Sequence, residues 1–139
     1  MQIKRKQDIP LYYTGYIGSS EVSYIQVDAR FTLSIMPRRV MHHMGIPVHR
    51  LSATQITIYD FNTNGTRPMG KIKLKCQIRD VKSEVTCYVI DADPSYNLIL
   101  GRPWIHHNFI VPSMLHQVMK YVDEEGEIRM LIDEHLFKG

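Results

Sequence analysis

Two neighbouring stretches in the middle of the chain alternate apolar and polar residues, and this alternation limits the fold more than any other feature. From residue 71 to residue 78, apolar side chains at every second position are separated by Lys or Gln, and a similar pattern runs from 81 to 89. Successive side chains of a strand point to opposite faces, so period two predicts two strands with one buried and one solvated face each. A two-residue turn at 79 and 80 joins them into an antiparallel hairpin.

The register of this hairpin predicts the state of the two cysteines. The turn sets Leu74 opposite Val85 on the apolar face, and it sets Cys76 opposite Ser83. Cys76 and Cys87 are then four positions out of line, roughly 13 Å at ~3.3 Å per residue. A disulfide requires Cα atoms within about 7 Å, so we expect two free thiols.

Shorter segments on both sides of the hairpin predict further elements. Residues 1–9 are expected to be a flexible lead-in, and residues 10–139 a single domain by the length prior. Strands are predicted over 11–17, 22–27, 55–59, 98–100 and 128–132, short helices over 37–44 and 104–108, and a strand or short helix over 114–121.

Composition narrows the functional classes. Apolar residues make up 44% of the chain and charged residues 22%, which is typical of a globular protein. The formal charge is +3, but the basic residues are scattered among 14 acids, so nucleic acid is not expected as a partner. No stretch approaches the ~18 apolar residues of a membrane span, and a secretion signal is missing, so we expect a cytoplasmic, intracellular protein that is not membrane-bound.

The seven histidines do not follow a metal-ligand pattern. There is no HExxH or comparable spacing, and the adjacent His42 and His43 point to different faces of the predicted helix. A metal hydrolase is therefore disfavoured, and no metal or cofactor is expected.

Two apolar runs end in residues that suggest a site. Residues 24–27 lead into Asp28, and residues 98–100 lead into Gly101. Two strands that end near each other, one with a carboxylate and one with glycine, can build a cleft. The polar, glycine-bearing loop at 60–70 has the composition of a mobile hairpin tip.

The chain resembles the retropepsin-like aspartic proteases, and most closely the protease domain of plant gypsy-class long-terminal-repeat retrotransposon polyproteins. The matching segments are PLYYTGYIG at 10–18, VD at 27–28, SIMP at 34–37, MGI at 44–46, VIDADPSYNLILGRPWIHHN at 89–108 and VPSMLHQ at 111–117. LILGRPWIH is the segment most specific for that group. The resemblance implies an all-β, closed barrel with one or two short helices, in which residues 98–101 pass beside the Asp28 turn and residues 60–69 form a flap over the substrate.

The resemblance also implies a chemistry and an assembly. Two Asp28 carboxylates, one from each subunit of a homodimer, share a proton, so that one activates water and the other protonates the carbonyl oxygen of a polypeptide substrate. Strand 128–132 is expected at the interface between subunits. The substrate-binding positions are Ala29, Arg30, Phe61, Asn62, Gly65, Leu100 and Gly101.

The catalytic turn departs from the family pattern at two positions. Family members have Asp-Ser/Thr-Gly or Asp-Gly-Gly, whereas this chain has Asp28-Ala29-Arg30. Alanine lacks the hydroxyl that braces the two turns, arginine replaces a glycine that lets substrate approach closely, and a guanidinium near the carboxylates favours their charged forms. The sequence thus leaves two alternatives: a polyprotein-processing endopeptidase impaired by this turn, or a non-catalytic dimerisation or peptide-binding module on the same fold.

Overall fold

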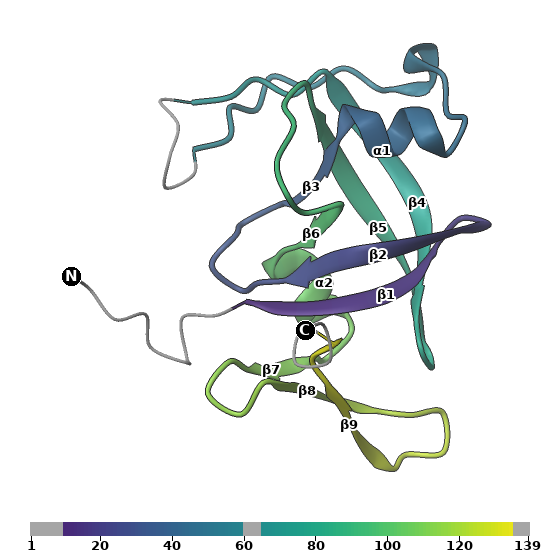
Figure 1. Cartoon of the computed structure of the whole chain (residues 1–139), viewed down its shortest axis with the longest axis vertical. Coiled ribbons are helices and arrows are strands. Elements are labelled where there is room, and N and C mark those ends of the chain that lie inside the picture. The colour runs from purple at the N-terminus through teal and green to yellow at the C-terminus, as the bar shows by residue number, and fades with distance from the viewer. Residues whose placement is uncertain (1–9, 60–64, 135–139) are drawn as a thin grey trace.

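The computed structural model describes residues 10–59 and 65–134, which form a closed β barrel with a three-stranded sheet below it in the view of Figure 1. The all-β prediction with a closed barrel and short helices is confirmed. In chain order the elements are β1 (Leu11–Ile17), β2 (Ser20–Val27), β3 (Ser34–Pro37), α1 (Arg38–His43), the 3-10 helix η2 (Val48–Arg50), β4 (Gly70–Ile78), β5 (Val81–Ile90), β6 (Leu98–Leu100), α2 (Arg102–His107), β7 (Val111–Ser113), β8 (Val118–Val122) and β9 (Ile128–Ile132).

The barrel closes in the strand order β1-β2-β6-β3-β5-β4. β2 runs parallel to β6, with Val27 opposite Leu100, and β3 runs parallel to β5. The other pairs around the barrel are antiparallel. The parallel pairing of β2 with β6 places the residues that follow these two strands, Asp28 and Gly101, next to each other.

The central hairpin has the predicted register. Leu74 pairs with Val85 and Cys76 with Ser83, and both cysteines are free and buried. Burial raises the pKa of the Cys76 thiol to about 12. Residues at alternate positions of β4 point into the barrel, as period two requires.

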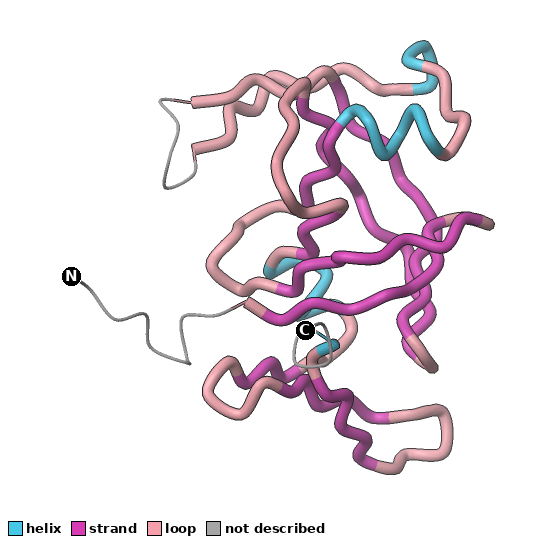
Figure 2. Tube along the Cα trace, viewed as in Figure 1, coloured by secondary structure: helices cyan, strands magenta, loops and turns pink. Residues whose placement is uncertain are grey.

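The core fills the barrel and continues under the small sheet. Figure 2 shows that the helices are short segments on a framework made of strands. Trp104 and Ile105 of α2 are buried in the same apolar cluster as Met119 and Tyr121 of β8. Trp104 also donates from Nε1 to Ser83 Oγ at 2.8 Å, which fixes α2 against the hairpin. None of the helices in residues 10–59 and 65–134 has the length and apolar character needed to cross a membrane.

Two sequence predictions require correction, and two strands were not predicted. Residues 55–59 do not form a strand, because only Ile58 pairs, through an isolated bridge to Thr66. The facing segment contains Pro68, which lacks the N–H that a longer ladder would use. In residues 114–121, the strand starts only at Val118, after a turn. The strands β3 and β7 were not predicted, since each is short and contains a proline.

Candidate active site

Asp28 follows the last residue of β2 and is completely buried. Its backbone N–H donates to Leu100 O at 3.1 Å, which continues the parallel pairing of β2 with β6 by one residue. Its backbone carbonyl accepts from the N–H of Phe31 at 3.3 Å, so the chain turns immediately. The carboxylate is therefore fixed by backbone bonds on both sides of a tight turn.

Four donor groups surround the Asp28 carboxylate. Oδ1 accepts from the backbone N–H of Arg30 at 2.9 Å and from Arg30 Nε at 3.0 Å. Oδ2 accepts from Arg30 Nη2 at 2.8 Å and from Gln26 Nε2 at 3.1 Å. A carboxylate offers about four lone-pair positions, so this one is saturated by its own chain.

The Arg30 guanidinium binds Asp28 through both oxygens. Nε and Nη2 form the forked contact that makes arginine a specific partner of carboxylates. The Arg30 side chain is 41% exposed, whereas that of Asp28 is fully buried, so the guanidinium covers the carboxylate on its solvent side. A water molecule cannot bind this carboxylate as a nucleophile unless Arg30 moves away.

Gly101 lets the Asp28 turn approach β6. A Cβ at this position would lie 2.3 Å from the backbone oxygen of Leu33 and 2.8 Å from that of Phe31. Its N–H donates to the buried Ser34 Oγ at 3.1 Å. Only glycine fits this contact, because both obstructing atoms belong to the backbone.

Two tyrosines lie near the turn. The rings of Tyr12 and Tyr24 meet edge to face, with centroids 6.1 Å apart. Burial raises the pKa of Tyr12, and the negative charges of Asp133 and Asp28 raise it further. Tyr12 lies opposite Gln26, two residues before Asp28 on β2.

The structure brings together most of the predicted site residues. Asp28, Ala29 and Arg30 form one turn, and Leu100 and Gly101 lie against it. Gly65 directly precedes Thr66 of the Ile58–Thr66 bridge, and the nearest side chains to it are those of Tyr59 and Thr57. Phe61 and Asn62 are outside the described residues.

Gln26 and Ser34 belong to the site but were not predicted. Gln26 had a sequence signal, because a residue two positions before Asp28 on a strand lies on the same face. Ser34 had none, since its bond to Gly101 joins residues 67 positions apart. Within the described residues, no group of three or more His, Cys, Asp or Glu side chains is arranged to hold a metal ion.

Comparison with known proteins identifies the architecture. No family model and no characterised protein sequence matches the chain. Among solved structures, the retroviral protease-like domain of Ddi1 from Leishmania major superposes with a TM-score of 0.62 and 18% identity, covering 88% of this chain and 94% of that chain. The chain has a retropepsin-like fold. A retropepsin-like aspartic protease from Rickettsia conorii gives a TM-score of 0.56 and 15% identity over 80% of this chain and 82% of that chain.

Proposed function

We propose that this chain is the protease domain of a plant gypsy-class retrotransposon polyprotein, built as an aspartic endopeptidase and held inactive by Arg30. The observation that carries the proposal is the buried Asp28 at the end of β2, whose N–H bonds Leu100 O just before Gly101 in a retropepsin-like fold. The segment LILGRPWIH supports the retrotransposon origin. The substrate is an unfolded stretch of polypeptide.

Peptide hydrolysis by this design needs two carboxylates, and one chain supplies one such turn. A second copy therefore contributes its own Asp28, and the site lies on the two-fold axis of a homodimer. One carboxylate takes a proton from water while the water oxygen adds to the carbonyl carbon, and the other gives its proton to the carbonyl oxygen. Proton transfer to the nitrogen then accompanies cleavage of the C–N bond.

Arg30 opposes this chemistry in two ways. Its guanidinium occupies the lone pairs that a nucleophilic water would use. A cation bonded to each carboxylate also stabilises the ionised form, whereas the reaction requires that the pair hold one proton. The unmodified protein should therefore cleave peptides very poorly, even at mildly acidic pH.

The decisive variant is Arg30→Gly. It removes the guanidinium but keeps the backbone N–H that bonds Asp28 Oδ1. We expect cleavage of an unfolded polyprotein segment to rise by about 10²-fold or more, the usual contribution of general acid-base catalysis. Adding Asp28→Asn should abolish the gain, because an amide cannot cycle the proton. Arg79→Gly is the matched control, since Arg79 lies in the β4–β5 turn at a φ of 53° that glycine accepts.

Efficient cleavage by the unmodified protein, lost in Asp28→Asn, would show that Arg30 is not inhibitory while leaving the protease assignment intact.

The saturation of Asp28 favours a second candidate, a non-catalytic dimerisation or peptide-binding module. In this case the Arg30–Asp28 ion pair is a permanent part of the cleft. An Arg30→Gly protein that is folded and dimeric, and that binds unfolded peptide without cleaving it, would support this function over the first.

A further inference from the structure

One side of β5 is only partly covered by its neighbour. β5 runs from Val81 to Ile90, and β4 pairs with it over its full length. On the other side, the short strand β3 pairs only with residues 87–90. Within the parts of the chain that the structure describes, no strand pairs with residues 81–86 on this side. This stretch is called the open edge below.

The bonds of β4 show which backbone groups point out from the open edge. Only every second residue of an antiparallel strand bonds a given neighbour. Lys71 of β4 exchanges both of its backbone bonds with Ser52, at 2.8 and 2.9 Å, so it does not bond β5. Because Lys71 lies opposite Tyr88, the even-numbered residues of β5 point away from β4. The N–H and C=O of Lys82 and Glu84 therefore point out from the open edge, and no backbone group among the described residues bonds them.

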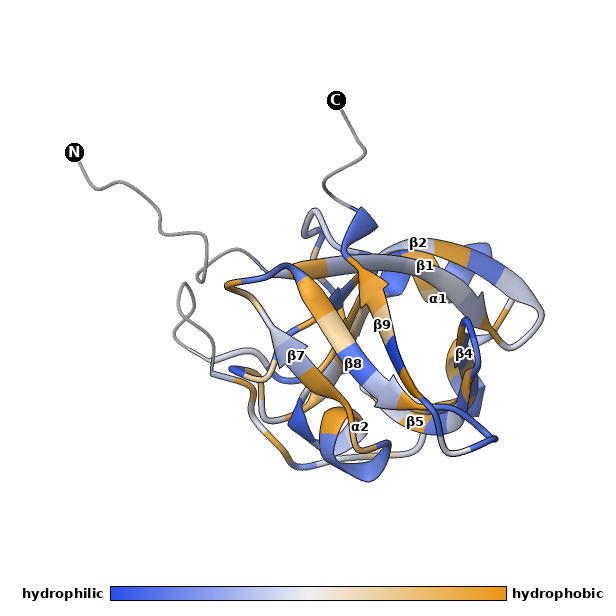
Figure 3. Cartoon of the chain, turned by 90° about the horizontal axis from the view of Figure 1, so that it is seen from below, coloured by the Kyte–Doolittle hydropathy of each residue, from blue (hydrophilic) through white to orange (hydrophobic). Residues whose placement is uncertain are grey.

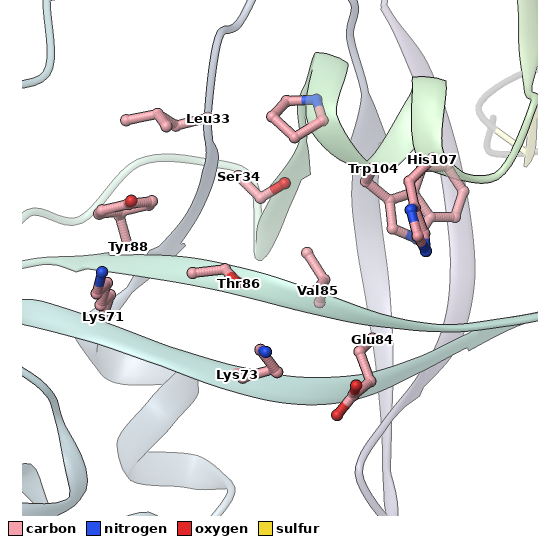
Figure 4. Close-up of a pocket in the computed structure, with 11 residues that line it drawn as sticks. Leu33, Ser34, Lys71, Lys73, Glu84, Val85, Thr86, Tyr88, Trp104 and His107 are labelled. Atoms are coloured by element: carbon pink, nitrogen blue, oxygen red, sulfur yellow. The ribbon is translucent and has the colours of Figure 1, made fainter.

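The open edge borders a groove of about 510 Å³, within the size range of ligand sites. Val85 and Thr86 line it from β5, and α2 supplies a second wall. Figure 4 shows Trp104 and His107 extending from α2 toward the strand that carries Thr86. The bond from Trp104 to Ser83 holds this wall in place. The open edge therefore faces a groove flanked by a helix instead of a further strand.

An exposed strand edge is a template for pairing with another chain, and strand addition is a common mode of peptide recognition. We propose that the open edge binds an extended peptide segment of a partner protein as an added strand. Backbone bonds to Lys82 and Glu84 supply affinity, and the side chains of the peptide meet the lining of the groove. This site is distinct from the cleft beside Asp28, because residues 28–30 do not line the groove.

The lining of the groove specifies the side chains of the peptide. Successive side chains of an added strand point to opposite faces of the sheet. Leu33 is half-buried and Pro103 is exposed, and both give the groove accessible apolar surface. An apolar side chain at every second position of the peptide can cover this surface.

The charges of the groove predict an acidic residue between the apolar ones. Lys71 and Lys73 line the groove and lie opposite uncharged residues of β5. Neither lysine takes part in an ion pair among the described residues. Glu84 is the acid in the lining, and it lies opposite a different lysine, Lys75. A peptide carboxylate on the outer face is therefore attracted to the end of the groove near Thr86.

A phosphate backbone would fit the open edge less well. It offers acceptors for the N–H groups of Lys82 and Glu84, but it has no donor for their carbonyls. The carboxylate of Glu84 also repels it. A peptide backbone carries a donor and an acceptor on each residue, so it can satisfy both kinds of group.

The test is fluorescence anisotropy with a labelled peptide, blocked at both ends, of the sequence Thr-Val-Glu-Val-Thr. Two derivatives carry N-methyl groups on alternate amides, one at the valines and the other at the remaining residues. An added strand directs only every second N–H to its neighbour. One derivative should therefore bind about ten-fold more weakly than the parent peptide, through lost hydrogen bonds, and the other should bind like the parent.

Glu84→Pro blocks the open edge from the side of the protein. Proline lacks the N–H, but at this position the N–H does not bond β4, so the hairpin keeps its ladder. Peptide binding should fall by about ten-fold or more. Glu84→Gln is the matched control, which keeps the edge and should bind at least as tightly as the unmodified chain. The N-methyl derivatives make the same test on the unmodified chain, so the result does not depend on the folding of the proline variant.

The charge of the peptide is tested separately. Lys73→Gln should weaken binding of the glutamate peptide several-fold and leave unchanged the binding of a peptide with glutamine in its place. Lys120→Gln changes an exposed lysine of β8 that does not line the groove, and it should leave both affinities unchanged.

Four results would overturn the proposal. Equal binding of the two N-methyl derivatives would show that the peptide does not add as a strand, and unchanged binding in Glu84→Pro would place it elsewhere. Oligouridine competing as well as the peptide would assign the groove to nucleic acid. A dimer lost in Glu84→Pro would assign the open edge to a second copy. The measurement is of binding and requires no cleavage, so it is independent of the proposed protease function.

Discussion

The hydrogen bonds to the Asp28 carboxylate fall into two groups: those that the Arg30 side chain makes and those that do not depend on it. The N–H of residue 30 and the amide of Gln26 bond the carboxylate whatever side chain follows Ala29. Nε and Nη2 of Arg30 supply the remaining contacts. A single substitution can therefore remove the guanidinium from the carboxylate and leave the turn in place. For this reason a change at Arg30 tests the function more specifically than a change at Asp28.

A second prediction about a single residue concerns Gly101 and the free energy of unfolding. Gly101→Ala forces a methyl group against the backbone oxygens of Leu33 and Phe31, which cannot rotate away. We expect a loss near the upper end of the ~1–3 kcal/mol typical of overpacking, measured by urea unfolding. Gly126→Ala is the control: its φ is +83° but its Cβ would meet open space, so the loss should be about 1 kcal/mol. Equal losses would mean that close contact at Gly101 has no special cost.

At the scale of elements, the β4–β5 hairpin makes the thiols depend on the fold. Burial raises the pKa of Cys76 from 9.0 to about 12 and also raises that of Cys87. Unfolding at pH 9 to 12 therefore releases protons, and stability should fall as the pH rises through this window, while it is unaffected by these thiols below it.

Thiol labelling and unfolding at several pH values check this prediction. Both cysteines should resist a thiol reagent in the native protein at mildly alkaline pH and react rapidly in urea. Cys76→Ala should reduce the alkaline loss of stability relative to the unmodified chain. Rapid labelling of the native protein would contradict the burial of the thiols.

At the scale of the whole molecule, the sheet β7-β8-β9 exposes an apolar surface that is suited to contact with a second copy. Ile128, Met130 and Ile132 of β9 are 74%, 64% and 49% exposed, and β9 is the last strand in the order β7-β8-β9. Figure 3 shows this sheet from below, with β9 mostly in the hydrophobic colour. Such a patch on an edge strand is typical of an interaction surface.

We expect the molecule to self-associate through β9, as a catalytic pair of Asp28 residues requires. Sedimentation should show a concentration-dependent dimer, and Met130→Asp should raise its dissociation constant by about ten-fold or more, equivalent to ~1.4 kcal/mol. Val48→Asp, at a 49% exposed apolar residue of η2, should leave the association unchanged. A strict monomer at high micromolar concentration would count against both this interface and catalysis.

The sequence by itself determined the features that depend on neighbouring residues. Period two specified the β4–β5 hairpin and the register of Leu74 with Val85, because a strand cannot shift by one residue without turning its apolar face to water. Local turn residues likewise indicated that apolar runs stop before Asp28 and Gly101. The free state of the cysteines followed from the same register.

Only the tertiary structure decided what depends on segments distant in sequence. The parallel pairing of β2 with β6 and the bond from Gly101 to Ser34 join residues about 70 positions apart, for which local patterns carry no information. The forked contact of Arg30 depends on the turn geometry, and the bond from Trp104 to Ser83 depends on how the hairpin packs against α2. Local periodicity determines which face of a strand is buried, whereas chain packing determines which side chains meet. The chemistry of this protein depends on the side chains that packing brings together.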